Sequence, residues 1–117
     1  MTDLGNQLAL LPAGSISRLV IGGHGSPDGP KFDANDNNRF NADQVSKAGA
    51  DTIQKIKTAL AANALIDLQA CACAFGQTGI DNMQFLANTF SARVRGAKDC
   101  IADWDDTSTE WVTVSPQ

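Results

Sequence analysis

Short apolar runs alternate with amphipathic stretches along this chain, and this alternation constrains its fold more than any other feature. The apolar runs at residues 18–21 and 65–70 are short and flanked by small or polar residues, which is typical of buried strands. Residues 50–63 and 81–93 carry apolar side chains at intervals of three to four positions, which predicts amphipathic helices. The chain therefore begins as strand, helix, strand, helix.

Two further strands and the helix ends are predicted from local patterns. Residues 100–102 and 111–114 are short apolar segments on either side of an acidic turn, and we expect both to be strands. Asn41 has the side chain expected of a cap before a short helical turn. Thr78 or Asp81 could cap the helix that follows.

This order of elements predicts one α/β domain covering residues 1–117. The length of 117 residues fits a single domain. We expect a three-layer architecture, in which a mostly parallel sheet is flanked by helices. Residues 26–41 are rich in Asp, Asn, Gly and Pro, which predicts a long loop of the kind that often carries function.

Charge and composition exclude several classes of partner. The net charge is −4 with only nine Lys and Arg residues, so we expect no nucleic-acid partner. Neither a membrane-spanning apolar stretch nor a basic signal segment is present in the sequence, so we expect no membrane association. The count of three cysteines is odd, and Cys71 and Cys73 are too close in sequence to suggest a disulfide framework, which favours reduced thiols and a cytoplasmic location.

The candidate chemistry lies where the two predicted parallel strands end. The first strand ends at Gly22-Gly23-His24-Gly25, and the second ends at Ala70-Cys71. Because the carboxyl ends of parallel strands meet at one edge of a sheet, His24 and Cys71 should lie on the same edge. An imidazole beside a thiol is the arrangement that activates a cysteine nucleophile.

These two segments resemble the signatures of caspase-like cysteine peptidases. Residues 19–25, LVIGGHG, are similar to the apolar strand followed by His-Gly in that clan. Residues 65–71, LIDLQAC, are similar to its strand ending in Gln-Ala-Cys. In caspases the His precedes the Cys by about 50 residues, and here His24 precedes Cys71 by 47. A Cys stands at position 73, where the caspase pattern has Gly.

The resemblance implies a cysteine-type peptidase that hydrolyses a peptide or amide bond and needs no cofactor. Cys71 would be the nucleophile, His24 would protonate the leaving group, and the N–H groups of Gly25 and Cys71 would hold the oxyanion. In the clan the two side chains need not touch in the resting state. The substrate would be a peptide or protein. We also consider an acidic substrate pocket made by three nearby carboxylates, Asp103, Asp105 and Asp106. The free edge of a small sheet would allow a homodimer.

Two other classes of function remain open from the sequence. The domain could be a non-catalytic caspase-like scaffold that serves protein interaction or dimerisation. It could also bind a metal, since Cys71 and Cys73 with His24 and Cys100 would supply four Cys/His ligands. Cys73 is also an alternative nucleophile or redox partner if the backbone after Cys71 stays extended.

The long loop offers a third candidate site. Asp33, Asn35 and Asn37 occupy the first, third and fifth positions of a calcium-binding loop pattern. The pattern lacks the Gly at position six and the Glu at position twelve, where Asn38 and Gln44 stand. A solvated loop explains the same residues without a metal.

Overall fold

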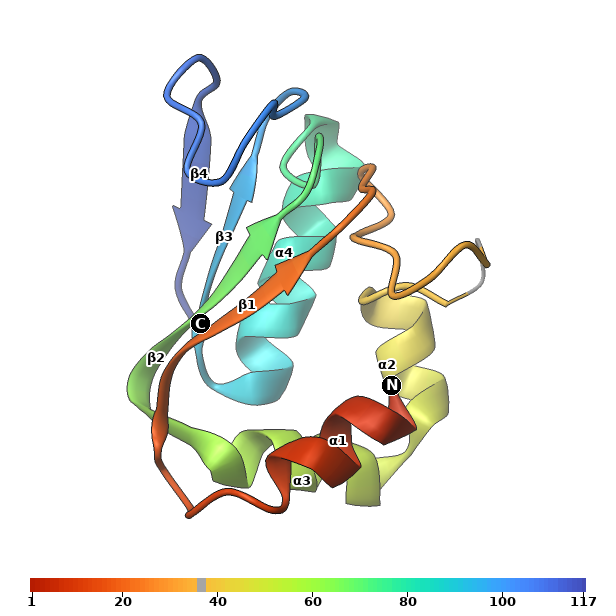
Figure 1. Ribbon diagram of the computed structural model, residues 1–117, viewed down its shortest axis with the longest axis vertical. Helices are drawn as coiled ribbons and strands as arrows, with labels where there is room; N and C mark the ends of the chain where they lie inside the picture. The colour runs from red at the N-terminus through yellow and green to blue at the C-terminus, as the bar shows by residue number, and fades with distance from the viewer. Residues whose placement is uncertain (36–37) are drawn as a thin grey trace.

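Four strands form one open sheet in the order β1-β2-β3-β4 in the computed structural model, which describes residues 1–35 and 38–117 (Figure 1). The strands β1, β2 and β3 are mutually parallel, and β4 runs antiparallel to β3. Their bounds are Ile16–Gly22, Leu60–Gln69, Arg93–Ala97 and Trp111–Val114. The predicted α/β class with a mostly parallel sheet is therefore confirmed.

In the part of the chain that the structure describes, four helices connect and extend this sheet. The connection from β1 to β2 contains α2 (Ala42–Ala48) and α3 (Ala50–Ala59), and α4 (Gly76–Phe90) connects β2 to β3. A further helix, α1 (Thr2–Leu8), packs mainly against α3. The Asn41 side chain accepts the N–H of Gln44 at 2.8 Å, which confirms it as the cap of α2.

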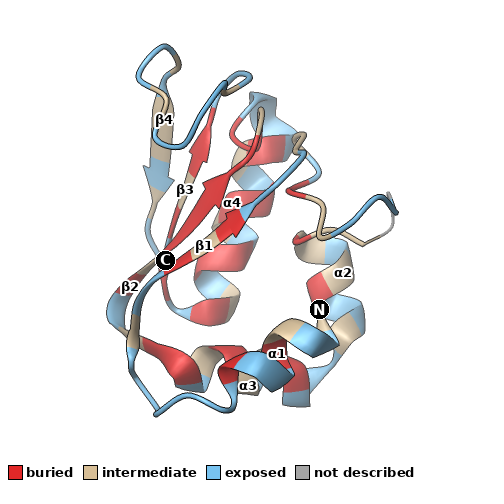
Figure 2. Ribbon diagram, viewed as in Figure 1, coloured by how far each residue is buried: buried red, intermediate tan, exposed pale blue. Residues whose placement is uncertain are grey.

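The hydrophobic core lies on one face of the sheet, between the strands and the helices (Figure 2). Ile66 and Leu68 of β2 are fully buried there, as are Met83 and Leu86 of α4. Because the parallel strands follow one another in a single direction, right-handed crossovers place every connecting helix on the same face. The expectation of three layers is thus wrong for the described chain, which has two.

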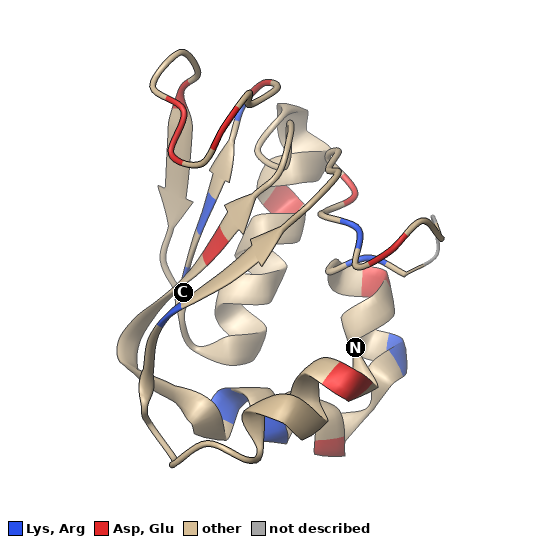
Figure 3. Cartoon of the chain, in the orientation of Figure 1, with Lys and Arg blue, Asp and Glu red and all other residues tan. Residues whose placement is uncertain are grey.

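The opposite face of the sheet carries charged residues instead of a second layer of helices (Figure 3). Arg18, Asp67 and Arg95 lie on three neighbouring strands, and both arginines bond to the same carboxylate. Side chains alternate between the two faces of a strand. The neighbours of Asp67 in sequence, Ile66 and Leu68, therefore point into the core.

Several predicted boundaries differ from the structure. The third strand is Arg93–Ala97, and residues 100–102 belong to the loop that follows it. In β3, Gly96 passes against α4, where a Cβ would lie 2.9 Å from the Met83 sulfur. The first predicted helix ends at Ala59 because the chain becomes extended at Leu60.

The start of α4 was also misplaced. The helix begins at Gly76 after Phe75, and neither Thr78 nor Asp81 caps it. In addition, α1 lacks a strong apolar period and was not predicted. In the described ranges, none of the helices combines the length and the apolar character that crossing a membrane requires.

Candidate functional site

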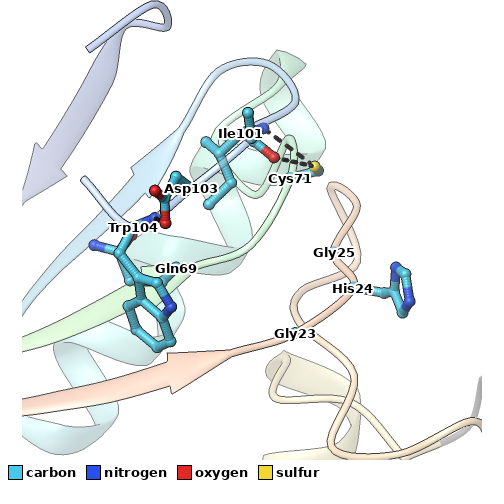
Figure 4. Close-up of a pocket in the computed structure, with 9 residues that line it drawn as sticks. Gly23, His24, Gly25, Gln69, Cys71, Ile101, Asp103 and Trp104 are labelled. Carbon is cyan, nitrogen blue, oxygen red and sulfur yellow. Dashed lines mark hydrogen bonds between the residues drawn. The ribbon is translucent and has the colours of Figure 1, made fainter. Parts of the chain in front are cut away.

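His24 and Cys71 follow adjacent parallel strands and line the same cavity, as the strand positions predict (Figure 4). The cavity has a volume of about 620 Å³ and lies beyond the carboxyl ends of β1 and β2. Its other wall comes from the loop between β3 and β4. The lining residues are Gly23, His24, Gly25, Gln69, Cys71, Ile101, Ala102, Asp103 and Trp104.

Gly25 is the point at which the His24 loop meets the Cys71 loop. A Cβ at this position would lie 2.6 Å from both the Ala70 Cβ and the Cys71 carbonyl oxygen, and 3.0 Å from the Cys71 nitrogen. Such contacts are too short for any residue except glycine. The absence of a side chain therefore allows the two loops to pack directly together.

Two backbone donors are left unpaired beside this contact. In the described part of the chain, the N–H groups of Gly25 and Cys71 make no hydrogen bond. Unpaired N–H groups at a cavity wall are the kind of donor that stabilises an oxyanion in acyl transfer. These are the two donors that the resemblance implies.

The Cys71 sulfur is held by the loop that follows β3. The thiol is half-buried, and its Sγ accepts the N–H of Ile101 at 3.2 Å. The thiol in turn donates to the Ile101 carbonyl oxygen at 3.9 Å. The two bonds to Ile101 therefore orient the sulfur at the cavity wall.

The His24 side chain is exposed and points away from Cys71 (Figure 4). The His24 carbonyl oxygen accepts the N–H of Lys31 at 2.8 Å, which fixes the backbone of the loop. The imidazole itself has no hydrogen-bond partner among the described residues. No hydrogen bond joins the two side chains in this state. A dyad would form only after the imidazole reorients toward the sulfur.

The backbone turns immediately after Cys71, so Cys73 does not face the cavity. Ala72 has a φ of 57°, in the left-handed region. Cys73 is fully buried in the core, and burial raises the pKa of its thiol to about 12. A thiol that stays protonated at neutral pH is a poor nucleophile, which argues against Cys73 as an alternative to Cys71.

Of the three acidic residues considered for a substrate pocket, only Asp103 lines the cavity. Asp106 accepts the N–H groups of Ala102 and Ser108, and these bonds lower its pKa. Asp105 bonds to Arg95, which is the main reason that its pKa is lowered. Asp105 and Asp106 therefore hold the loop in place, and a full acidic pocket is not assembled.

An ion-pair network beneath the cavity was missed by the sequence analysis. Asp67 is fully buried and accepts bonds from Arg18 Nε at 3.0 Å and Arg95 Nη1 at 3.2 Å. Gln69 donates to Asp105 at 3.0 Å and accepts the Asp105 N–H at the same distance. The network thus ties the strand that ends at Cys71 to the loop that forms the far wall.

A signal for this network was present in the sequence. Asp67 and Gln69 are two positions apart in an otherwise apolar strand, so they share one face. A buried carboxylate requires a cationic partner, and Arg18 begins the predicted neighbouring strand.

Trp104 covers the edge of the cavity next to β1. Its indole lies against Gly22, where a Cβ would come within 2.8 Å of the ring, and the side chain remains 60% exposed. Trp111, by contrast, stacks on the guanidinium of Arg95 at 4.0 Å from its ring centroid. The two tryptophans therefore have different surroundings.

The geometry supports neither the Cys/His metal site nor the calcium-binding loop. Within residues 1–35 and 38–117, no three His, Cys, Asp or Glu side chains gather in a group that could hold a metal ion. In the long loop, Asp33 accepts bonds from the Asn38 side chain and the Asn35 N–H, and these bonds lower its pKa. Asn37, the third candidate calcium ligand, lies outside the described residues.

Comparisons with models of known families, with curated protein sequences and with solved structures find no match to this chain. The α/β class rests on the structure. The caspase-like resemblance rests on the two sequence motifs.

Proposed function

We propose that this domain is a caspase-like cysteine hydrolase that cleaves a peptide or amide bond with Cys71 and His24. The observation that carries the proposal is that both residues line one cavity at the carboxyl ends of adjacent parallel strands. The Gly25 contact keeps the two loops together, so the separation between them is fixed by packing.

The proposed reaction begins with the sulfur of Cys71. The imidazole of His24 takes the proton of the Cys71 thiol and becomes an imidazolium. The thiolate attacks the substrate carbonyl carbon, and the carbonyl oxygen takes up the negative charge. The N–H groups of Gly25 and Cys71 donate to this oxyanion. The Ile101 N–H holds the sulfur in position before the attack.

His24 completes the reaction as a general acid and base. The imidazolium gives its proton to the leaving nitrogen as the C–N bond breaks, which leaves a thioester on Cys71. The neutral imidazole then takes a proton from water, which attacks the thioester and releases the acid. Both steps require the exposed His24 side chain to turn toward the cavity.

A labelling experiment tests the nucleophile. Peptides that carry a thiol-directed acyloxymethyl ketone should label the parent protein on Cys71, and Cys71→Ala and His24→Ala should each abolish labelling without unfolding the protein. Cys100→Ser is the matched control, because it removes an exposed thiol and should leave labelling intact. Labelling of Cys71→Ala at the parent's rate would show that the nucleophile has been misassigned.

A specific observation favours a second candidate, a non-catalytic scaffold for protein interaction. The imidazole of His24 points away from Cys71, and the outer face of the sheet lacks a helical layer among the described residues. Trp104 is exposed beside the cavity and could contact a protein. Absence of peptide-probe labelling, together with slow alkylation of Cys71 at neutral pH, would favour the scaffold.

A further inference from the structure

Cys71 lies beside a second cysteine that comes from a different part of the chain. The N–H of Ala72 donates to the Asp99 carbonyl at 3.1 Å, and the N–H of Ile101 donates to Cys71 Sγ at 3.2 Å. Asp99 and Ile101, which take part in these two bonds, are the sequence neighbours of Cys100. They hold the backbone around Cys100 against the backbone around Cys71, and such close backbones are what a disulfide needs.

The Cys71 side chain also raises the pKa of the Cys100 thiol, first through hydrogen bonding and then through its charge. Cys100 is exposed and Cys71 is half-buried at the cavity wall, so a small molecule in solution can reach the pair. Cys73 is fully buried on the core side of the turn and is not part of this arrangement.

We propose that Cys71 and Cys100 are a redox pair, which a low-molecular-weight disulfide such as glutathione disulfide converts into a reversible internal disulfide. The bond would occupy the sulfur of Cys71 and mask it. Formation of the disulfide does not depend on catalysis. Its consequence, that the domain is switched off under oxidising conditions, rests on the proposed function.

The exchange takes place in two balanced steps. The Cys71 thiolate attacks one sulfur of glutathione disulfide, which forms a mixed disulfide and releases one glutathione thiolate. Cys100 then loses its proton and attacks the Cys71 sulfur, which forms the internal bond and releases the second glutathione. Two protein thiols are oxidised, one glutathione disulfide is reduced to two thiols, and the protons of the cysteines pass to them through solvent.

Mass spectrometry of the intact chain tests the pairing. The parent protein, treated with glutathione disulfide and then alkylated, should lose two hydrogens, retain one alkylatable thiol after denaturation and yield a cross-linked peptide joining Cys71 to Cys100. Cys100→Ser should instead stop at the mixed disulfide and gain one glutathione on Cys71. Cys73→Ala is the matched control and should form the internal bond as the parent does. A parent protein that accumulates only glutathione adducts, or a link that persists in Cys71→Ser, would overturn the inference.

The same samples separate this inference from the proposed function. If the disulfide forms but the reduced protein is never labelled by the peptide probe, the redox-pair inference is supported and the proposed hydrolase function is contradicted. If the reduced protein is labelled but no internal disulfide forms, only the redox pair fails. If both hold, oxidation should remove the labelling completely, and dithiothreitol should restore it.

Discussion

Asp67→Asn should destabilise the domain strongly although the residue lies outside the cavity. The Asp67 carboxylate is fully buried and accepts bonds from Arg18, Arg95 and Gln69. An asparagine has nearly the same shape but carries no charge. Its amide group would present donors where three donors already converge.

The size of this effect follows from the burial of the partners. Removing one member of a buried ion pair costs about 3–5 kcal/mol. The side chain of Arg18 is 46% exposed and that of Arg95 is 22% exposed, so water can partly replace the lost bonds. We therefore expect the lower end, a loss of about 3 kcal/mol in the free energy of unfolding. With an unfolding entropy of about 2.1 cal/mol/K per residue, this lowers Tm by about 12 °C.

Urea and thermal unfolding followed by circular dichroism measure the change. The matched control is Asp43→Asn, whose carboxylate is 67% exposed and pairs with Lys47 one turn along α2. Exposed pairs of this kind contribute about 0.5 kcal/mol or less. A free energy of unfolding for Asp67→Asn within about 0.5 kcal/mol of the parent's, the range of ordinary surface substitutions, would show that the buried ion pairs do not stabilise the domain.

Three further predictions follow from the geometry. Burial raises the pKa of the Cys73 thiol in the folded protein to about 12 from an ordinary value of 9.0, so this thiol ionises first in the unfolded chain. The free energy of unfolding should therefore fall above about pH 9, by up to about 1.4 kcal/mol per pH unit. Cys73→Ala should flatten this alkaline slope in urea titrations, and an unchanged slope would contradict the assignment. Gly25→Ala places a Cβ 2.6 Å from the Cys71 carbonyl oxygen, so it should lower Tm and slow the labelling of Cys71 by the peptide probe. Gly14→Ala, where the added Cβ meets open space, should leave the labelling unchanged. Equal labelling of the two variants would count against the loop contact. The pKa of Asp105 is lowered chiefly by the hydrogen bond that it accepts from Arg95. Its carboxylate therefore stabilises the fold above about pH 4, and this stabilisation is lost as the pH falls through the folded-state pKa. Asp105→Asn should reduce the acid sensitivity of Tm, and an unaltered acid profile would exclude this role.

The sequence predicted those parts of the fold that depend on local periodicity. The apolar runs that became β1 and β2 were correctly identified, and Asn41 caps α2 through its own side chain. Parallel neighbours end at one sheet edge, so the shared cavity of His24 and Cys71 was also predictable. These conclusions required only the spacing of residues along the chain.

What failed depended on contacts between distant segments. The third strand was misplaced because Gly96 shows no strand preference by itself, and its role depends on packing against Met83. The orientation of the His24 ring and the bond from Ile101 to Cys71 join segments whose spatial relation is set by the whole fold. The number of layers depends on strand order, which local periodicity does not encode.

His24 is proposed to act on the sulfur of Cys71, and the alkylation kinetics of this sulfur report on the interaction. In a Cys73→Ala/Cys100→Ser background, Cys71 is the one remaining thiol of the sequence. Its rate of alkylation by iodoacetamide is measured from pH 5 to pH 9, with and without His24→Ala. Because an imidazole changes charge between about pH 5 and 8, we expect a step in the alkylation rate in that range, and this step should disappear in His24→Ala. The rate at pH 7 should be at least about tenfold lower without the imidazole. Superimposable profiles for the two proteins would show that His24 does not act on Cys71.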